Sequence, residues 1–432
     1  MKIKEPIEEK TSEKQTPENP RTDADLKRVS REKFEAEIKA GALTSIINLV
    51  NDLIELAYTL RASDIHINPQ AKSVRVRLRI DGALQDEVSL SKDIQSEVIS
   101  RIKILCGLRT DEHHTTQDGR FSYRLKTNNM IDVRVSIVPT YHGENAVLRL
   151  LADNVEQFTL ETLGFSEDEV GKIKKALNKP WGMILATGPT GSGKTTTLYT
   201  LIKMLNNNNR SIITIEDPIE YNIEGVNQIQ VNSRTELNFA NGLRAVLRQD
   251  PNIIMVGEIR DFETASLAVN TALTGHLFLS TLHTTDSATT IVRLLDMKIE
   301  PFLIASTVNL AIAQRLVRKI CDHCKIAYKP TEAELKSLSG IMPKELLDSV
   351  QNFYRGQGCP QCDKTGYRGR QSINEVLVTN DAIKEAILQR NSSSRIRQIA
   401  IESGMTTMLE DGFNKVLEGV TTVEEVLRVI NE

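Results

Sequence analysis

Residues 188–195 have the residue types and spacing of a phosphate-binding loop. Their sequence, Gly-Pro-Thr-Gly-Ser-Gly-Lys-Thr, satisfies the complete pattern G-x-x-x-x-G-K-[ST]. The glycines let backbone N–H groups curl around a β-phosphate at a helix N-terminus. Lys194 can reach the β- and γ-phosphates, and the Thr195 hydroxyl can hold Mg²⁺. The loop therefore predicts binding of a nucleoside triphosphate. The predicted contact residues are Gly188, Pro189, Thr190, Gly191, Ser192, Gly193, Lys194, Thr195 and Thr196.

Carboxylates follow two further apolar runs. Glu258 comes after an apolar run and a glycine, and Glu216 and Asp217 end another run at 213–217. The carboxyl ends of strands in a parallel α/β sheet face the ligand crevice. One carboxylate there can bind Mg²⁺ through water, while another orients or deprotonates the attacking water. Taken singly, either pair is equally consistent with a helix cap or a surface acid.

Two histidines flank one predicted strand. His276 and His283 are seven residues apart, so they are expected at or near opposite ends of that strand. An imidazole beside a γ-phosphate can distinguish ATP from ADP. The alternative is that each histidine is a hydrogen-bonded structural residue.

Four of the five cysteines form two C-x-x-C pairs, Cys321 with Cys324 and Cys359 with Cys362. Each pair presents two thiolates on a tight turn, and two such turns complete a tetrahedral, closed Zn²⁺ site. The alternatives are redox chemistry and unpaired buried thiols. Cys106 is expected to be a lone core thiol.

The elements that must position these residues indicate an α/β fold with a RecA-like P-loop core. Apolar strands are predicted at 182–187, 211–215, 252–256 and 276–280, and they alternate with helical segments. Strands buried on both faces and separated by helices favour a parallel sheet. The core is expected to span 163–317. A zinc-binding tetracysteine lobe is expected at 318–372, and a C-terminal helical region at 373–432.

A small N-terminal α/β domain is predicted at 42–152, joined to the core by a linker at 153–162. It begins with an amphipathic helix over 43–60 and continues with strands and a second helix. The strand 74–80 alternates strictly, with Arg75, Arg77 and Arg79 on one face. These arginines are either a solvated sheet face or a subunit or phosphate contact. Residues 1–41 are predicted to form a mostly disordered charged tail, because 1–40 holds ten acidic and ten basic residues, with a frayed helix from Ser30 as an alternative at its end.

The bulk composition narrows the class of function. The net charge is −3, with 54 basic and 57 acidic residues. That balance disfavours nucleic-acid binding, which usually needs a basic excess. No apolar run approaches 18 residues and the N-terminus is too charged for a signal peptide, so a cytoplasmic protein is expected.

Several motifs resemble those of the ATPases of type II secretion and type IV pilus assembly. The resemblance covers about 43–432. The matching segments are Ala62–Ile67, Arg79–Gly82, Gln117–Arg120, Asp132–Ser136, Ile215–Tyr221 (an aspartate box), Leu247–Pro251, Met255–Asp261 (a Walker B region), Thr274–Thr284 (a histidine box), Gly358–Cys362 and Thr365–Arg370.

The resemblance implies a hexameric ring that uses ATP to work on an inner-membrane platform protein, with membrane contact only through partners. It implies Glu258 as the catalytic glutamate with Glu216 in support, His276 and His283 as nucleotide sensors, and Arg120 and Arg134 as arginine fingers. Many members carry a further N-terminal docking domain, whose place the charged tail takes here. The alternatives are a RecA-like nucleic-acid translocase or helicase and an ATP-binding scaffold.

Overall fold

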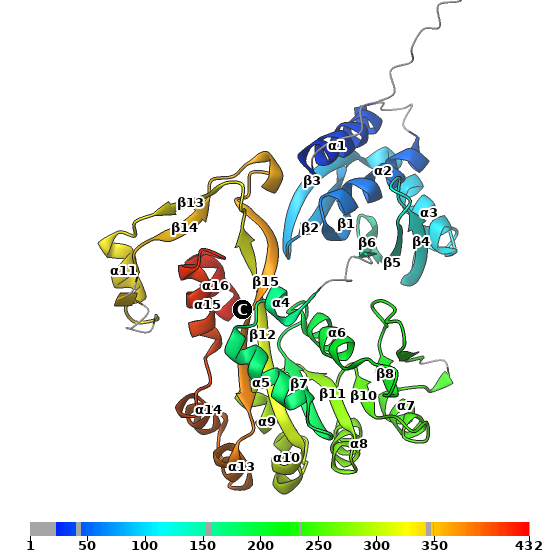
Figure 1. The fold of residues 1–432 in the computed structure, drawn as a ribbon. Helices are drawn as coiled ribbons and strands as arrows, with labels where there is room; N and C mark the ends of the chain where they lie inside the picture. The colour runs from blue at the N-terminus through cyan, green and yellow to red at the C-terminus, as the bar shows by residue number, and fades with distance from the viewer. Residues whose placement is uncertain are drawn as a thin grey trace, which may run out of the picture.

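The protein consists of two bodies, each built on one sheet, that lie one above the other, and of a thin projection (Figure 1). The computed structural model describes residues 23–39, 45–152, 158–232, 235–342, 347–348 and 350–431. Residues 1–22 of the predicted tail and 153–157 of the predicted linker therefore lie outside the described residues. The predicted linker also ends earlier than expected, because a short helix begins at Leu160.

The upper body is a six-stranded antiparallel sheet in the order β3-β2-β1-β6-β5-β4. Helices α2 and α3 pack on β1 and β4 respectively, and their apolar residues share one buried cluster with the strands. The elements are α2 (Ile46–Thr59), β1 (Ala62–Pro69), β2 (Ser73–Ile80), β3 (Ala83–Ser91), η2 (Lys92–Ile94), α3 (Gln95–Cys106), β4 (Gln117–Arg124), β5 (Met130–Thr140) and β6 (Gly143–Ala152).

Part of the segment predicted to be disordered is helical. Helix α1 (Asp23–Lys39) packs against α2, and its Phe34 is 1% exposed. Lys27 forms an ion pair with Asp363 at 2.9 Å, and Arg31 forms one with Glu87 at 2.8 Å. The prediction of disorder is wrong for this segment, because its charged residues bind partners far away in the chain, and the helix that was an alternative from Ser30 begins earlier, at Asp23.

The lower body is a seven-stranded sheet in the order β15-β12-β7-β11-β10-β8-β9. All its strand pairs are parallel except β12 with β15. The strands are β7 (Gly182–Thr187), β8 (Ile212–Glu216), β9 (Asn227–Gln230), β10 (Ile253–Val256), β11 (Leu277–Leu282), β12 (Val308–Ile320) and β15 (Tyr367–Val378). This arrangement confirms the predicted parallel α/β core.

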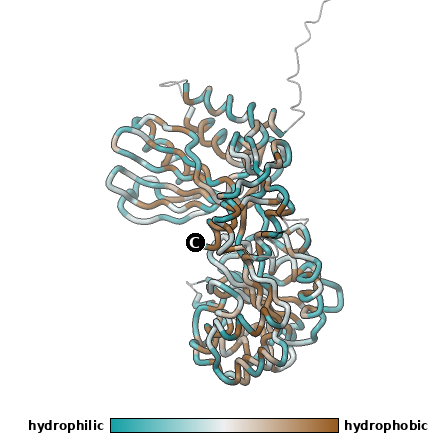
Figure 2. The backbone as a smooth tube through the Cα atoms, turned by 90° about the vertical axis from the view of Figure 1, so that its left-hand side faces the viewer, coloured by the Kyte–Doolittle hydropathy of each residue, from teal (hydrophilic) through white to brown (hydrophobic). Residues whose placement is uncertain are grey.

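Helices cover both faces of this sheet (Figure 1). Met183 and Leu185 of β7 lie in one apolar cluster, and Ile184 and Ala186 lie in the cluster on the other face. Burial on both faces explains the continuous apolar run of this strand. Figure 2 shows hydrophobic residues gathered inside the two bodies. The helices are α4 (Leu160–Leu163), α5 (Glu167–Leu177), α6 (Lys194–Leu205), α7 (Phe239–Val246), α8 (Phe262–Leu273), α9 (Ser287–Asp296), α10 (Pro301–Thr307), α13 (Asp381–Leu388) and α14 (Ser393–Glu402).

The projection is the cysteine-bearing lobe, carried by the β12–β15 hairpin (Figure 1). It holds β13 (Lys325–Tyr328), α11 (Glu332–Leu338), β14 (Phe353–Gly356) and η4 (Pro360–Cys362). The helices α15 (Met408–Leu417) and α16 (Val423–Asn431) pack at its base. The region predicted as helical from 373 begins instead with strand residues 373–378, because β15 pairs along β12.

Candidate nucleotide site and four-cysteine cluster

The phosphate-loop motif leaves the carboxyl end of β7 and leads into helix α6. Gly193 is the N-cap of α6, with φ of 90°, in the left-handed region that favours glycine. The Lys194 ammonium donates to the carbonyl oxygens of Gly188 at 2.8 Å and Pro189 at 3.0 Å. Burial lowers the pKa of Lys194 to about 8. The loop thus has the strand–loop–helix setting that phosphate binding requires.

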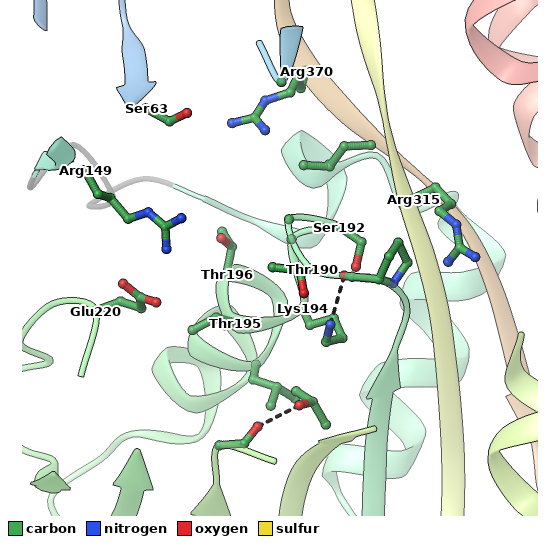
Figure 3. Close-up of a pocket in the computed structure, with 18 of the residues that line it drawn as sticks. Ser63, Arg149, Thr190, Ser192, Lys194, Thr195, Thr196, Glu220, Arg315 and Arg370 are labelled. Carbon is green, nitrogen blue, oxygen red and sulfur yellow. Dashed lines mark hydrogen bonds between the residues drawn. The ribbon is translucent and has the colours of Figure 1, made fainter. Parts of the chain in front are cut away.

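The loop faces a cavity of about 1000 Å³ between the two sheets. Residues 189–196 form one wall. Figure 3 shows Ser63 and Arg149, both of the upper sheet, across the cavity from that loop. The upper sheet therefore closes the side of the site that the core leaves open.

Glu258 lies in this cavity, just beyond the carboxyl end of β10. Its carboxylate accepts hydrogen bonds from Arg260 and from His283, the latter at 2.9 Å. Although burial opposes it, the two donors hold the pKa of Glu258 below its usual value. The carboxylate is therefore ionised at neutral pH and 15% exposed, as a base acting on water requires.

Glu216 ends β8 in a different environment, with only 2% of its surface exposed. It accepts hydrogen bonds from the Tyr199 hydroxyl, from Thr214 Oγ1 at 2.6 Å and from Gln228 Nε2 at 3.1 Å. Burial and the neighbouring carboxylate raise the pKa of Tyr199. Because Glu216 is almost fully buried and three donors engage its oxygens, whereas the Glu258 side chain is 15% exposed, Glu216 is less suited than Glu258 to accept a proton from water.

The two predicted histidines lie at opposite ends of β11. His283 follows the strand and lines the cavity beside Glu258. His276 precedes the strand, and its Nδ1 lies 3.1 Å from the Thr271 carbonyl oxygen. Six strand residues separate the two ends by about 20 Å. His276 is therefore not brought to this chain's own phosphate loop.

The two predicted arginines are cross-strand neighbours on β4 and β5. Arg134 Nη2 donates to the Ile219 carbonyl at 2.6 Å, in the segment after β8, and its Nη1 lies 3.9 Å from Glu220. Arg120 is exposed, and both arginines line a second cavity next to the first. They face the core without reaching the loop of the same chain.

Further arginines line the site, of which only Arg79 was singled out from the sequence, as part of the stripe on strand 74–80. Arg149 and Arg79 line the main cavity, and both lie near the buried Asp64, at 3.0 Å and 3.6 Å. Figure 3 shows Arg149 directed toward Glu220. Arg315 and Arg370 come from β12 and β15. In a strand, the alternation of apolar and polar residues shows which side chains share a face. Among the predicted strands, that alternation was used only for 74–80, which contains Arg79.

The four cysteines of the two C-x-x-C pairs come together as predicted. Their sulfur atoms all lie within 4.8 Å of one another. The distances are 3.8 Å for Cys321–Cys359 and for Cys324–Cys362. Four thiolates about 2.3 Å from one ion in a tetrahedron lie about 3.8 Å apart, so the cluster fits a metal of Zn²⁺ size.

Backbone N–H groups favour the ionised form of one thiol in this cluster. Cys359 N and Gly366 N donate to the Cys362 sulfur at 3.2 Å and 3.3 Å. Although burial opposes it, these bonds lower the pKa of Cys362 to about 7. A thiolate is the form that binds metal.

Comparison with known proteins gives consistent matches. The family described as type II/IV secretion system protein matches residues 39–428. The chain is 47% identical to the type II secretion system protein E of Xanthomonas campestris pv. campestris, over 93% of this chain and 70% of that protein. It is 47% identical to the type IV pilus assembly ATPase PilB of Thermus thermophilus, over 88% of this chain but only 42% of that protein.

Among solved structures, the fold is similar to that of another ATPase. The ATPase DotB of Legionella pneumophila superposes with a TM-score of 0.65 at 24% identity, over 88% of this chain and 94% of the other. This similarity supports the predicted fold. Among the described helices, none has the length and apolarity needed to cross a membrane.

Proposed function

Because this chain belongs to the family of type II/IV secretion system proteins, we propose that it is a motor that drives assembly of a type IV pilus or a type II secretion pseudopilus. The chain is a P-loop ATP hydrolase. The observation that carries the proposal is the position of the phosphate loop opposite Glu258, in a cavity that the N-terminal sheet closes. This arrangement lets a movement between the two sheets depend on the bound nucleotide.

We assign the chemical roles within this site as follows. Residues 188–196 bind the phosphates through backbone N–H groups and Lys194, and the Thr195 hydroxyl would hold Mg²⁺, which neutralises phosphate charge when bound. Glu258 orients the attacking water and accepts its proton, and His283 positions Glu258 through their hydrogen bond. Glu216 supports the site by fixing Tyr199.

Arg120 and Arg134 are proposed to stabilise the charge that develops on the γ-phosphate. They line the second cavity, between the upper sheet and the core, and lie outside the cavity of their own phosphate loop. A phosphate from a neighbouring subunit is therefore the better partner, and a ring of subunits, a hexamer by family likeness, would supply it. We propose that His276 is a structural residue in this chain.

The four-cysteine cluster is proposed to hold one structural Zn²⁺ through Cys321, Cys324, Cys359 and Cys362. The sulfur spacing supports this choice, and the cluster supplies four ligands, which leaves no open position for catalysis. Zinc binding would contribute about 10 kcal/mol or more to the folding of the lobe.

The partner of the motor is proposed to be an inner-membrane platform protein, with the chain held at the cytoplasmic side through that contact. We propose that residues 42–152 and 163–317 are the two bodies that move against each other. Nucleic acid is not an expected partner, since the net charge is −3.

The test is steady-state ATP hydrolysis by the purified chain, separated by size, with and without DNA. Activity that is confined to a hexamer-sized fraction, insensitive to DNA and abolished in Lys194→Ala supports the proposal. A several-fold increase with DNA would instead identify a nucleic-acid translocase. Activity that survives in Lys194→Ala would remove this loop from the mechanism.

A further inference from the structure

The side chain of Gln314 contacts the phosphate loop from the neighbouring strand. Ala313 of β12 pairs with Thr187, the last residue of β7, so Gln314 lies where the chain leaves β7 to form the loop. Gln314 is 1% exposed, and its Nε2 donates to the carbonyl oxygen of Ser192 at 2.8 Å.

Gln314 also occupies the space where two glycines of the loop would carry a side chain. A Cβ on Gly188 would lie 2.5 Å from the Gln314 carbonyl oxygen, and one on Gly193 would lie 2.9 Å from Gln314 Nε2. Both glycines also have φ in the left-handed region, at 143° and 90°. The loop therefore rests directly on Gln314 at two points, and its glycines permit that approach.

The hydrogen bond fixes the direction of one peptide group. In a trans peptide the C=O and the following N–H point in opposite directions. Because the Ser192 carbonyl is held toward β12, the Gly193 N–H is directed away from β12. Backbone N–H groups at the start of a helix are those that bind phosphate oxygens.

We infer that Gln314 is a positioning residue for nucleotide binding, which holds the Ser192–Gly193 peptide in its phosphate-binding orientation. The inference rests on the proposed nucleotide site. Gln314 does not line the main cavity, so its effect must pass through the loop.

Gln314→Met tests this role, because methionine has a similar length and cannot donate the bond. Asn309→Leu is the matched control. Asn309 lies near the start of β12, whereas Gln314 lies at its middle. Asn309 is 7% exposed, and its Nδ2 donates to the Trp181 carbonyl at 2.8 Å. Each change removes a bond from a buried side-chain amide to a backbone carbonyl, and only Gln314 reaches the phosphate loop. Asn309→Leu also removes the bond that Lys179 Nζ donates to Asn309 Oδ1 at 2.9 Å.

The measurements are the Kd of a fluorescent ADP, the KM and kcat for ATP, and the melting temperature. For Gln314→Met we expect about a tenfold rise in Kd and KM, since one hydrogen bond orients the peptide. We expect both variants to have a lower melting temperature than wild type. Asn309→Leu should nevertheless keep wild-type affinity for the nucleotide. Gln314→Glu should weaken binding further, because its carboxylate would face the Ser192 carbonyl.

The inference is overturned if Gln314→Met binds nucleotide as wild type does, or if both variants lose affinity equally. Failure of the wild-type protein to bind nucleotide would be a different result. It would contradict the proposed nucleotide site itself.

Discussion

His283 and Glu258 follow adjacent parallel strands, β11 and β10, and their side chains meet with Nε2 2.9 Å from Oε2. The pair lies at the same edge of the sheet as the phosphate loop, which follows β7. The strand order therefore places this hydrogen-bonded carboxylate in the same cavity as the phosphate loop, as the role proposed for Glu258 requires.

Glu258→Gln is expected to bind ATP with near-wild-type affinity and to lose hydrolysis by at least about a hundredfold. The amide keeps the shape of the side chain but cannot accept the proton of the attacking water. Single-turnover hydrolysis and nucleotide titration would separate the two effects. Retained hydrolysis would show that another group is the base.

Glu216→Gln is expected to lower stability, by about 1–3 kcal/mol, because an amide would be buried against three donors. Chemical denaturation measures the change, and Tyr199→Phe removes one of the same bonds for comparison. If Glu216→Gln instead keeps its stability and nucleotide affinity while hydrolysis disappears, the roles of the two glutamates are exchanged.

Arg120→Ala and Arg134→Ala are each expected to lower kcat in the oligomer by about tenfold or more, since arginines that neutralise transferring phosphate have large effects. Arg124→Ala is the control, because Arg124 lies on the same β4 strand and outside both cavities. Activity assays on size-selected oligomer would compare the three. Wild-type rates for the first two variants would show that Arg120 and Arg134 have no role in hydrolysis.

Purified protein is expected to contain about one zinc ion per chain, and Cys324→Ser should reduce that content and make the lobe sensitive to protease. Cys106→Ser is the matched control, because Cys106 lies outside the cluster. Elemental analysis gives the metal content. A protein with full activity, an intact lobe and no metal would contradict the assignment.

Stability below neutral pH should depend on Glu425. Although burial opposes it, hydrogen bonds from Arg428 and Arg318 lower the pKa of Glu425 from 4.5 to about 2. A lowered pKa in the fold stabilises it above pH 4.5, and that contribution is lost as pH falls toward 2.

The difference in unfolding free energy between wild type and Glu425→Gln should therefore be largest above pH 5 and shrink at lower pH. Denaturant titrations at pH 6 and pH 3.5 would measure it. An equal difference at both pH values would show that the carboxylate charge is not responsible.

The parts of this structure that could be predicted are those determined by short, local sequence patterns. The loop at 188–195 and the two cysteine pairs combine fixed residue types with fixed spacing, and the apolar run 182–187 required a strand buried on both faces. Local patterns also found Glu258 and Glu216 but could not rank them, since their hydrogen-bond partners come from other segments.

The features that were missed depend on contacts between distant segments. Gln314 is 122 residues from Ser192, whose carbonyl it binds. Lys27 is 336 residues from Asp363, and without that partner a charged helix at 23–39 looks like a tail. The strand at 373–378 exists because β12 offers it an edge, which local propensity does not reveal.

Strand β12 belongs to two sites at once. Residues from Leu310 to Ala313 are paired on both sides, with β7 and β15, whereas beyond Ala313 the strand pairs with β15 alone, up to Ile320. The next residue is Cys321, the first cysteine of the four-cysteine cluster. The hairpin therefore connects the backbone beside the phosphate loop to the lobe without a break. We expect a partner that binds the lobe to alter nucleotide affinity through the segment from Gln314 to Cys321, even without touching the nucleotide cavity.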